Sequence, residues 1–173
     1  MEIRQERKTD YHRIEQVIIK AFENMEMSDQ TEHKLVTKLR NTEGYIPELA
    51  LVAVKDGEVV GHILLTKVQI NNGKHSVTSL ALAPVSVLPR QQNQGIGKKL
   101  VDDALLYAKR LGFQSVIVLG HPDYYMKFGF APASRFDIQA PFEVPDDAFM
   151  ALELEKGALE NVSGVVHYPA AFS

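Results

Sequence analysis

The stretch PRQQNQGIGKKL, residues 89–100, combines residue types that suit the binding of an anion. Gly95 and Gly97 stand one residue apart, directly in front of an apolar run with helical spacing. Glycine lets a ligand approach the backbone without meeting a Cβ atom, and a helix start presents free N–H groups and about half a positive charge. Gln92 and Lys98 could add donors at the rim. The stretch therefore predicts either a phosphate site or a glycine-rich turn that merely starts a helix.

Two widespread phosphate-binding patterns do not fit this loop. A Walker A loop would need glycine where Gln92 stands and a hydroxyl residue where Lys99 stands. A Rossmann fingerprint would need glycine in place of Leu100. The remaining pattern is Gln92-x-x-Gly95-x-Gly97, placed between a predicted strand and a predicted helix.

Composition narrows the class of protein. A chain of 173 residues, 45% hydrophobic and 24% charged, is typical of one globular domain, which we expect to span residues 1–173. A net charge of −3 argues against nucleic acid or an anionic membrane as partners. The lack of cysteine excludes thiolate chemistry. The sequence contains no HExxH motif or comparable ligand spacing, so a metal site is not expected. The charged opening MEIRQERKTD is unlike a signal peptide, so we expect a cytoplasmic protein.

Hydrophobic periodicity predicts the elements that would hold the loop. Residues 2–7 fit a strand, Asp10 is placed to cap a helix that ends near Phe22, and Ser28 or Asp29 is placed to cap a second helix. The period then changes to that of a sheet. A three-stranded meander is predicted, with strands at 49–54, 59–70 and 76–88 and turns at Asp56-Gly57 and 71–73. Later strands are predicted near 136–140, 148–155 and 164–168.

The third meander strand contains a proline. Pro84 in SLALAPVSVLP removes a donor from the sheet, which predicts an edge strand or a bulge. Some backbone groups near residues 84–87 are therefore expected to lack a strand partner. A helix over 95–111 and a short buried strand over 113–120 are predicted next. A helix that connects two strands of a sheet favours a parallel arrangement, so we expect the strands before and after it to form a parallel pair. A short helix is predicted over 122–129.

In this order the elements resemble the GCN5-related N-acetyltransferase (GNAT) superfamily, and the resemblance covers nearly the whole chain. The pyrophosphate loop of that family, Gln/Arg-x-x-Gly-x-Gly/Ala, matches Gln92, Gly95 and Gly97. Its bulged strand segment is similar to PVSVLP at 84–89, and its Tyr-x-x-x-Gly-Phe element matches residues 125–130. The resemblance implies an α/β (α+β) fold with a mixed central sheet of about 6–7 strands, flanked by about 4 helices and splayed between the fourth and fifth strands.

The resemblance also implies acetyl-CoA as cosubstrate, without a metal. Backbone groups in the bulged segment would contact the pantetheine arm and the thioester, and the glycine loop would hold the pyrophosphate. The cofactor-binding residues implied are Val85, Ser86, Val87, Gln92, Asn93, Gln94, Gly95, Ile96, Gly97 and Lys98.

Tyr125 matches the tyrosine that protonates the departing thiolate in the family, and a neutral phenol with a pKa near ~10 can do so. The alternative is that Tyr125 is a core aromatic residue; its neighbour Tyr124 is expected to serve packing. His62, inside an apolar strand, is expected to be half-buried and hydrogen-bonded. His121 flanks the short helix and is a weaker catalytic candidate.

Two family features are missing. The asparagine that often follows the fifth strand is absent from residues 119–123, and the strand at 76–88 carries no acidic residue that could act as base. Glu23, Glu26 and Asp29 are candidate bases, although each is more typical of a solvated surface charge. Otherwise an ordered water molecule would act as the base, or no base would be needed because the amine binds in its neutral form.

The resulting hypothesis is direct transfer of the acetyl group from acetyl-CoA to an amine, since no cysteine can carry it. A small-molecule acceptor is preferred, and the alternatives are a peptide or protein amine and a non-catalytic acyl-CoA-binding module. The apolar end of the chain suits an internal strand or a homodimer contact. The tail resembles a little-characterised bacterial branch of the superfamily, which does not fix the acceptor.

Overall fold

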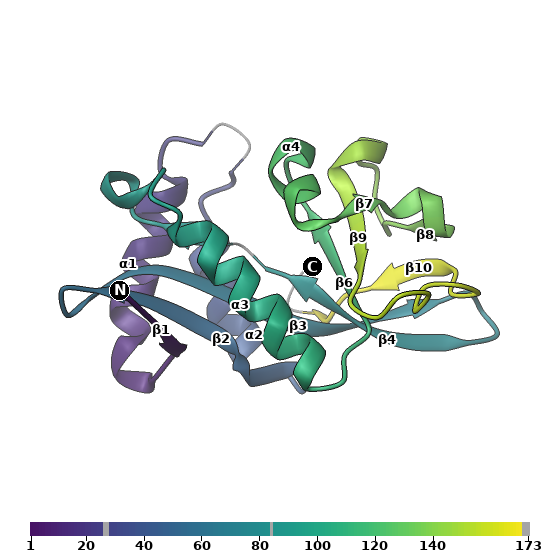
Figure 1. Cartoon of the computed structure of the whole chain (residues 1–173), viewed down its shortest axis with the longest axis horizontal. Helices are drawn as coiled ribbons and strands as arrows, with labels where there is room; N and C mark the ends of the chain where they lie inside the picture. The colour runs from purple at the N-terminus through teal and green to yellow at the C-terminus, as the bar shows by residue number, and fades with distance from the viewer. Residues whose placement is uncertain (26–27, 84, 171–173) are drawn as a thin grey trace. The chain divides into compact units, whose positions relative to one another are not determined.

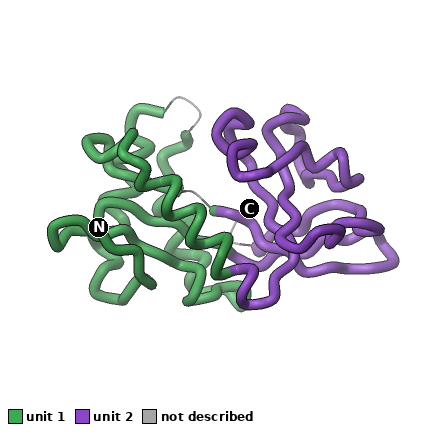
Figure 2. The backbone as a smooth tube through the Cα atoms, viewed as in Figure 1, with its two compact units in different colours: residues 1–65, 83–107 green, residues 66–82, 108–173 purple. Residues whose placement is uncertain are grey.

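The computed structural model describes the chain except for residues 26–27, 84 and 171–173. It contains two compact units: unit 1 comprises residues 1–65 and 83–107, and unit 2 comprises residues 66–82 and 108–173 (Figure 2). No helix in the described part of the chain is long and apolar enough to cross a membrane.

Unit 1 combines a meander with three helices (Figure 1). β1 pairs antiparallel with β2, and β5 pairs antiparallel with the first half of β3. Ile14, Val17 and Ile18 of α1 are buried, as the helical spacing predicts. The elements are β1 (Glu2–Gln5), α1 (Tyr11–Phe22), α2 (Glu32–Arg40), β2 (Tyr45–Lys55), β3 (Glu58–Asn71, which continues into unit 2), β5 (Ser86–Val87) and α3 (Ile96–Arg110, whose last turn lies in unit 2).

Unit 2 is built on the second half of β3. Its strand order is β3-β4-β6-β9-β7, and β10 pairs with both β3 and β8. The elements are β4 (Ser76–Leu82), β6 (Ser115–Leu119), α4 (Pro122–Tyr125), β7 (Ala131–Pro132), β8 (Ile138–Gln139), β9 (Phe149–Glu153) and β10 (Gly164–His167). The predicted mixed sheet with four α-helices is confirmed, and the two-residue strands β5, β7 and β8 raise the number of strands above the prediction.

The predicted parallel pair and the predicted opening between its strands are both present. β4 runs parallel to β6, and the pairs Leu80↔Val116 and Ala81↔Ile117 join them. Five residue pairs join β6 to β9, including Leu119↔Phe149 at the carboxyl end of β6. The two strands therefore part after Ala81, while β6 continues against β9.

A one-residue bulge separates β4 from β5. The Ala83 amide donates to the Leu64 carbonyl, and Ser86 is the partner of His62. Three residue steps on this strand thus face two steps on β3, so one extra residue is inserted. Pro84 itself lies outside the described residues, and the change of register on both sides of it favours the bulge over the edge strand. Ser86 and Val87 both have strand partners on β3, so the predicted lack of partners does not extend to them on that side.

Asp10 occupies the N-cap position of α1, as predicted, but its carboxylate makes no cap hydrogen bond to the helix. It accepts hydrogen bonds from the Arg4 guanidinium and the Arg7 amide instead. The predicted cap of the second helix is wrong: α2 starts at Glu32 with Thr31 as its N-cap, while Ser28 Oγ donates to the Glu32 carboxylate and Asp29 accepts from the Thr31 amide.

A buried carboxylate connects four elements of unit 1. The side chain of Glu6, only 1% exposed, accepts hydrogen bonds from Arg40 of α2 at 2.8 Å and from Tyr45 of β2 at 2.7 Å. It also contacts His62 Nε2 of β3 at 2.8 Å. Burial disfavours the carboxylate, but the hydrogen bonds from His62, Arg40 and Tyr45 outweigh it and lower the pKa of Glu6 to about 2. Ionised Glu6 therefore holds these elements together.

Glu6→Gln should reduce the free energy of unfolding by about 3 kcal/mol at pH 7, since a shift from 4.5 to about 2 is worth roughly this amount. The folded pKa lies below the unfolded one, so the stabilisation is complete above pH 4.5 and is lost as the pH falls toward 2. Urea unfolding of both proteins at pH 7, 5 and 3 measures the difference. Exposed Glu2→Gln is the control, and a Glu6→Gln effect that is constant across this range would contradict the account.

Candidate active site

The glycine loop has the backbone of an anion site. Asn93 and Gly95 adopt positive φ values of 64° and 83°, so the chain turns sharply before α3 begins at Ile96. The first helical hydrogen bond runs from the Lys99 amide to the Gly95 carbonyl at 3.0 Å. Helix geometry therefore leaves the preceding amides, those of the first turn, without an intrahelical acceptor.

Side chains outside the glycines hold the loop in place. The side-chain Nε2 of Gln92 donates to the Val87 carbonyl at 3.1 Å, which connects the loop to the end of β5. Lys55 Nζ donates to the side-chain oxygens of Gln94 at 3.0 Å and Gln91 at 3.3 Å. Gln92 was expected to donate to a ligand; in the structure one of its donors stabilises the loop itself.

The charges at the start of α3 pair along the helix. Lys98 Nζ lies 2.6 Å from Asp102 and Lys99 Nζ lies 3.4 Å from Asp103, both at i,i+4 spacing. These side chains and Gly95 line a cavity of about 300 Å³. Because both ion pairs are exposed and weak, a phosphate group can compete with Asp102 for Lys98.

The bulged segment lies against the glycine of β3. Val87 pairs with Gly61, where an added Cβ would lie 3.1 Å from the Ser86 carbonyl and 3.0 Å from the Leu100 side chain of α3. Glycine at position 61 thus lets α3 pack closely on the strand that precedes the loop. Sequence analysis missed this role, although Gly61-His62 inside an otherwise apolar strand was a visible signal.

Tyr125 is packed at the end of α4, in unit 2. It is 8% exposed, and its ring makes edge contacts with Tyr124 at 5.0 Å and Phe130 at 5.8 Å between centroids. Burial, with a smaller contribution from Tyr124, raises the pKa of its phenol. The phenol is therefore neutral at pH 7 and carries a proton that it can donate. Gly120 lies directly against this ring, since an added Cβ would stand 2.5 Å from Cε2.

The other candidates lie at the surface. His121 is exposed at the N-cap of α4. Glu23 is exposed, Asp29 bonds to Thr31 of its own turn, and Glu26 lies outside the described residues. His62, in contrast, is wholly buried and bonded to Glu6, so its predicted hydrogen bond is confirmed and its burial exceeds the prediction.

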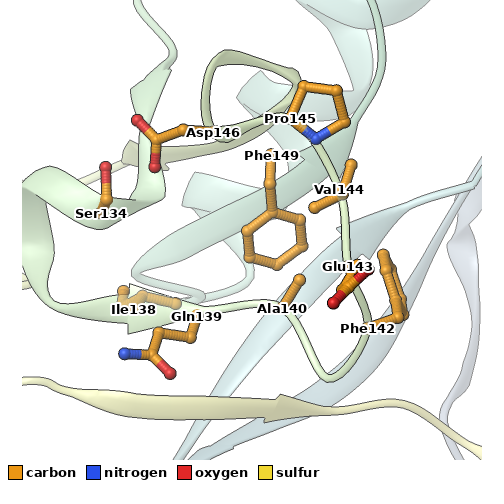
Figure 3. A pocket seen from close by; sticks show the side chains of 10 residues that line it. All are labelled: Ser134, Ile138, Gln139, Ala140, Phe142, Glu143, Val144, Pro145, Asp146 and Phe149. Carbon is orange, nitrogen blue, oxygen red and sulfur yellow. The ribbon is translucent and has the colours of Figure 1, made fainter.

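Unit 2 contains a cavity of about 640 Å³ next to the end of β6 (Figure 3). Phe149, at its centre in this view, pairs with Leu119, and the following Gly120 amide donates to the Ala148 carbonyl at 2.9 Å. The cavity is thus lined by Phe149, which neighbours the backbone partner of Gly120, and Gly120 in turn contacts the Tyr125 ring. Its lining is mainly apolar with two carboxylates: Ser134, Ile138, Gln139, Ala140, Phe142, Glu143, Val144, Pro145, Asp146 and Phe149.

Comparison with known proteins defines the class of this protein. The model of the acetyltransferase (GNAT) family matches residues 11–130. The chain belongs to this family, and it is an N-acetyltransferase, as its resemblance to the superfamily implied. In the described residues, no group of three or more histidine and acidic side chains could hold a metal.

Proteins similar to this chain include ones from Escherichia coli and Brucella melitensis. The uncharacterized N-acetyltransferase YhbS of Escherichia coli K12 is 30% identical over 174 residues, covering 100% of this chain and 99% of its own. The crystal structure of E. coli YhbS in complex with CoA has a TM-score of 0.89 at 29% identity and covers 99% of this chain and 91% of that one. The crystal structure of a GNAT family acetyltransferase from Brucella melitensis in complex with acetyl-CoA has a TM-score of 0.81 at 34% identity. The match covers 99% of this chain and 97% of that one.

Gly120→Ala should displace the Tyr125 ring, because the new methyl group would stand inside its contact distance. If Tyr125 donates a proton in the reaction, we expect a drop in kcat of about 10-fold or more, with little change in cofactor affinity. The measurement is a double-mutant cycle with Tyr125→Phe. Gly120→Ala should cost little further activity once the hydroxyl is gone; an equal loss in both backgrounds would show that Gly120 acts independently of Tyr125.

Proposed function

We propose that this enzyme transfers the acetyl group of acetyl-CoA directly to the amine of a small organic molecule. The observation that carries the proposal is the continuous path in unit 1 from the bulge, through β5, to the glycine loop and the free amides of α3. Such a path suits an extended ligand that ends in a diphosphate. Solved GNAT proteins similar to this chain bind CoA or acetyl-CoA, which agrees with this ligand.

Different residues along this path bind different parts of acetyl-CoA in this proposal. Backbone groups of Val85, Ser86 and Val87 take the pantetheine arm and the thioester, on the side of this segment that does not face β3. Amides of the loop from Asn93 onward take the pyrophosphate, and Lys98 adds a positive charge.

Tyr125 acts as the acid of the reaction in this proposal. As the amine nitrogen attacks the carbonyl carbon, the C–S bond breaks and the phenol protonates the departing sulfur. Burial keeps the phenol protonated at neutral pH, and nearby aromatic rings restrict its position. Because the chain has no cysteine, the acetyl group passes to the amine in one step.

The cavity of unit 2 supports a small, partly apolar amine as acceptor. Its volume of about 640 Å³ is within the usual range for small-molecule sites. Phe142 and Phe149 supply apolar surface, while Glu143 and Asp146 can attract the ammonium form of an amine. No lysine or arginine is among its lining residues. We further propose that the enzyme acts in the cytoplasm, where acetyl-CoA is available.

The test is release of free CoA thiol from acetyl-CoA in the presence of amines. We expect turnover with arylalkyl and alkyl amines that exceeds turnover with peptides bearing a free N-terminus or lysine. Tyr125→Phe should lower kcat about 100-fold and leave acetyl-CoA affinity within twofold.

Faster acetylation of peptides would replace the small-molecule acceptor with a protein acceptor. Binding of acetyl-CoA with no transfer to any amine would instead support the non-catalytic module. Unchanged kcat in Tyr125→Phe would remove Tyr125 from the mechanism and leave the transfer itself intact.

A further inference from the structure

Two buried polar atoms in unit 1 lack a hydrogen-bond partner within the described residues: His62 Nδ1 and Ser86 Oγ. The two side chains are 0% and 1% exposed. They belong to directly opposite residues of the antiparallel pair β3–β5. Opposite side chains point to the same face of a sheet, with Cβ atoms about 4.5–5.5 Å apart. Because buried polar atoms are normally paired, two orphans in this position point to a bound polar group between them.

The hydrogen bond to Glu6 determines which nitrogen of His62 carries the proton. Ionised Glu6 can only accept, and its Oε1 lies 2.8 Å from His62 Nε2, so Nε2 must be the donor. Burial lowers the pKa of His62, with Glu6 opposing that shift, and the ring is neutral. Nδ1 therefore presents a free lone pair that can accept a proton.

The bulge selects the face on which this pair lies. Gly61 faces α3, since an added Cβ would meet side chains of Leu100 and Ile96. The next residue, His62, points to the opposite face, where Glu6 is bound by Arg40 of α2. Figure 1 shows α3 in front of the strands of unit 1 and α2 behind them. Ser86 shares the face of His62 and belongs to the segment that the proposed function assigns to the thioester.

We propose that Glu6, His62 and Ser86 form a proton relay that removes the proton of the acceptor amine through a water molecule bound between Ser86 Oγ and His62 Nδ1. The inference rests on the proposed acetyl transfer and supplies the base that its sequence lacks on β4. His62 and Glu6 act through Ser86 and the water, so they position and accept the proton without touching the amine.

The amine nitrogen forms a bond to the acetyl carbon, and the electron pair of the C–S bond leaves with the sulfur, which takes the phenol proton of Tyr125 and becomes the thiol of CoA; the Tyr125 phenolate then regains a proton from solvent. The positively charged nitrogen gives a proton to Ser86 Oγ, whose own proton passes through the bound water to His62 Nδ1. The imidazolium formed is stabilised by Glu6 and later returns its proton to solvent.

Charged and titratable groups reach this site from several elements. Glu6 follows β1 and contacts the ring directly, and Tyr45 of β2 donates to the same carboxylate. Arg40 of α2 binds Glu6 and lies 3.8 Å from the centroid of the Tyr11 ring of α1. Glu6 and Arg40 together are neutral, so a proton on His62 gives the cluster one net positive charge. Such a charge is tolerable in a transient state and unfavourable in the resting one.

The kinetic test compares Ser86→Ala with Ser79→Ala, a matched change at another buried serine of the same segment of chain, bonded to Ser115 at 2.7 Å. We expect Ser86→Ala to lower kcat at pH 7 at least tenfold, to keep the Kd of acetyl-CoA within twofold, and to make kcat rise with pH as hydroxide replaces the relay. In the wild type, kcat should fall at low pH, where protonated His62 can no longer accept. Ser79→Ala should keep the wild-type pH profile. A wild-type profile in Ser86→Ala would overturn the relay.

A second measurement does not depend on turnover. Imidazole ¹⁵N NMR of the wild type should show His62 protonated on Nε2, with Nδ1 unprotonated and hydrogen-bonded, and Ser86→Ala should shift the Nδ1 resonance. Protonated Nδ1, or no change in the variant, would overturn the relay even in an active enzyme. Failure of acetyl-CoA to bind the wild type would instead overturn the proposed function.

Discussion

The extra residue between Ala83 and Ser86 is the constraint on which the geometry of unit 1 depends. Without it, the register of the strand would place Val85 opposite His62 and Ser86 opposite Gly61. Ser86 would then face α3, and a hydroxyl would lie in the close contact between Gly61 and that helix. With it, the hydroxyl shares a face with a buried histidine, and Val87 leads directly into the glycine loop. One insertion therefore sets both the polar pair and the exit of the chain toward α3.

The buried carboxylate of Glu6 gives this geometry its rigidity. It collects hydrogen bonds from α2, β2 and β3, so it fixes the tautomer and orientation of His62 as well as the packing of the helices. A carboxylate removed from water is stabilising only when such donors surround it. The same group thus connects the packing of unit 1 with the proton relay proposed above.

Local signals in the sequence were sufficient for much of the fold and for the loop. Asp56 and Gly57 adopt the positive φ values that a two-residue hairpin needs. Most of the apolar stripe of α3 is buried as its spacing indicates, although Leu111 at its end is exposed. Pro84 limited this part of the strand to two alternatives, an edge or a bulge. The predicted cap hydrogen bonds of Asp10 and Ser28 are absent, because Asp10 binds Arg4 and Arg7 and Ser28 binds the carboxylate of Glu32. The Glu6 cluster could not be predicted, since Glu6 lies 34 residues from Arg40 and 56 from His62 along the chain.

The central claim, that the bulged strand and glycine loop bind acetyl-CoA, is tested most directly by calorimetric titration of acetyl-CoA and free CoA into the wild type and Gly97→Glu. Glutamate at this position places bulk and negative charge where the pyrophosphate is expected, at the first turn of α3. The account predicts Kd values of about 1–100 μM for the wild type and at least 100-fold weaker binding for the folded variant. A folded wild type that binds neither ligand, or a variant that binds equally well, would contradict it.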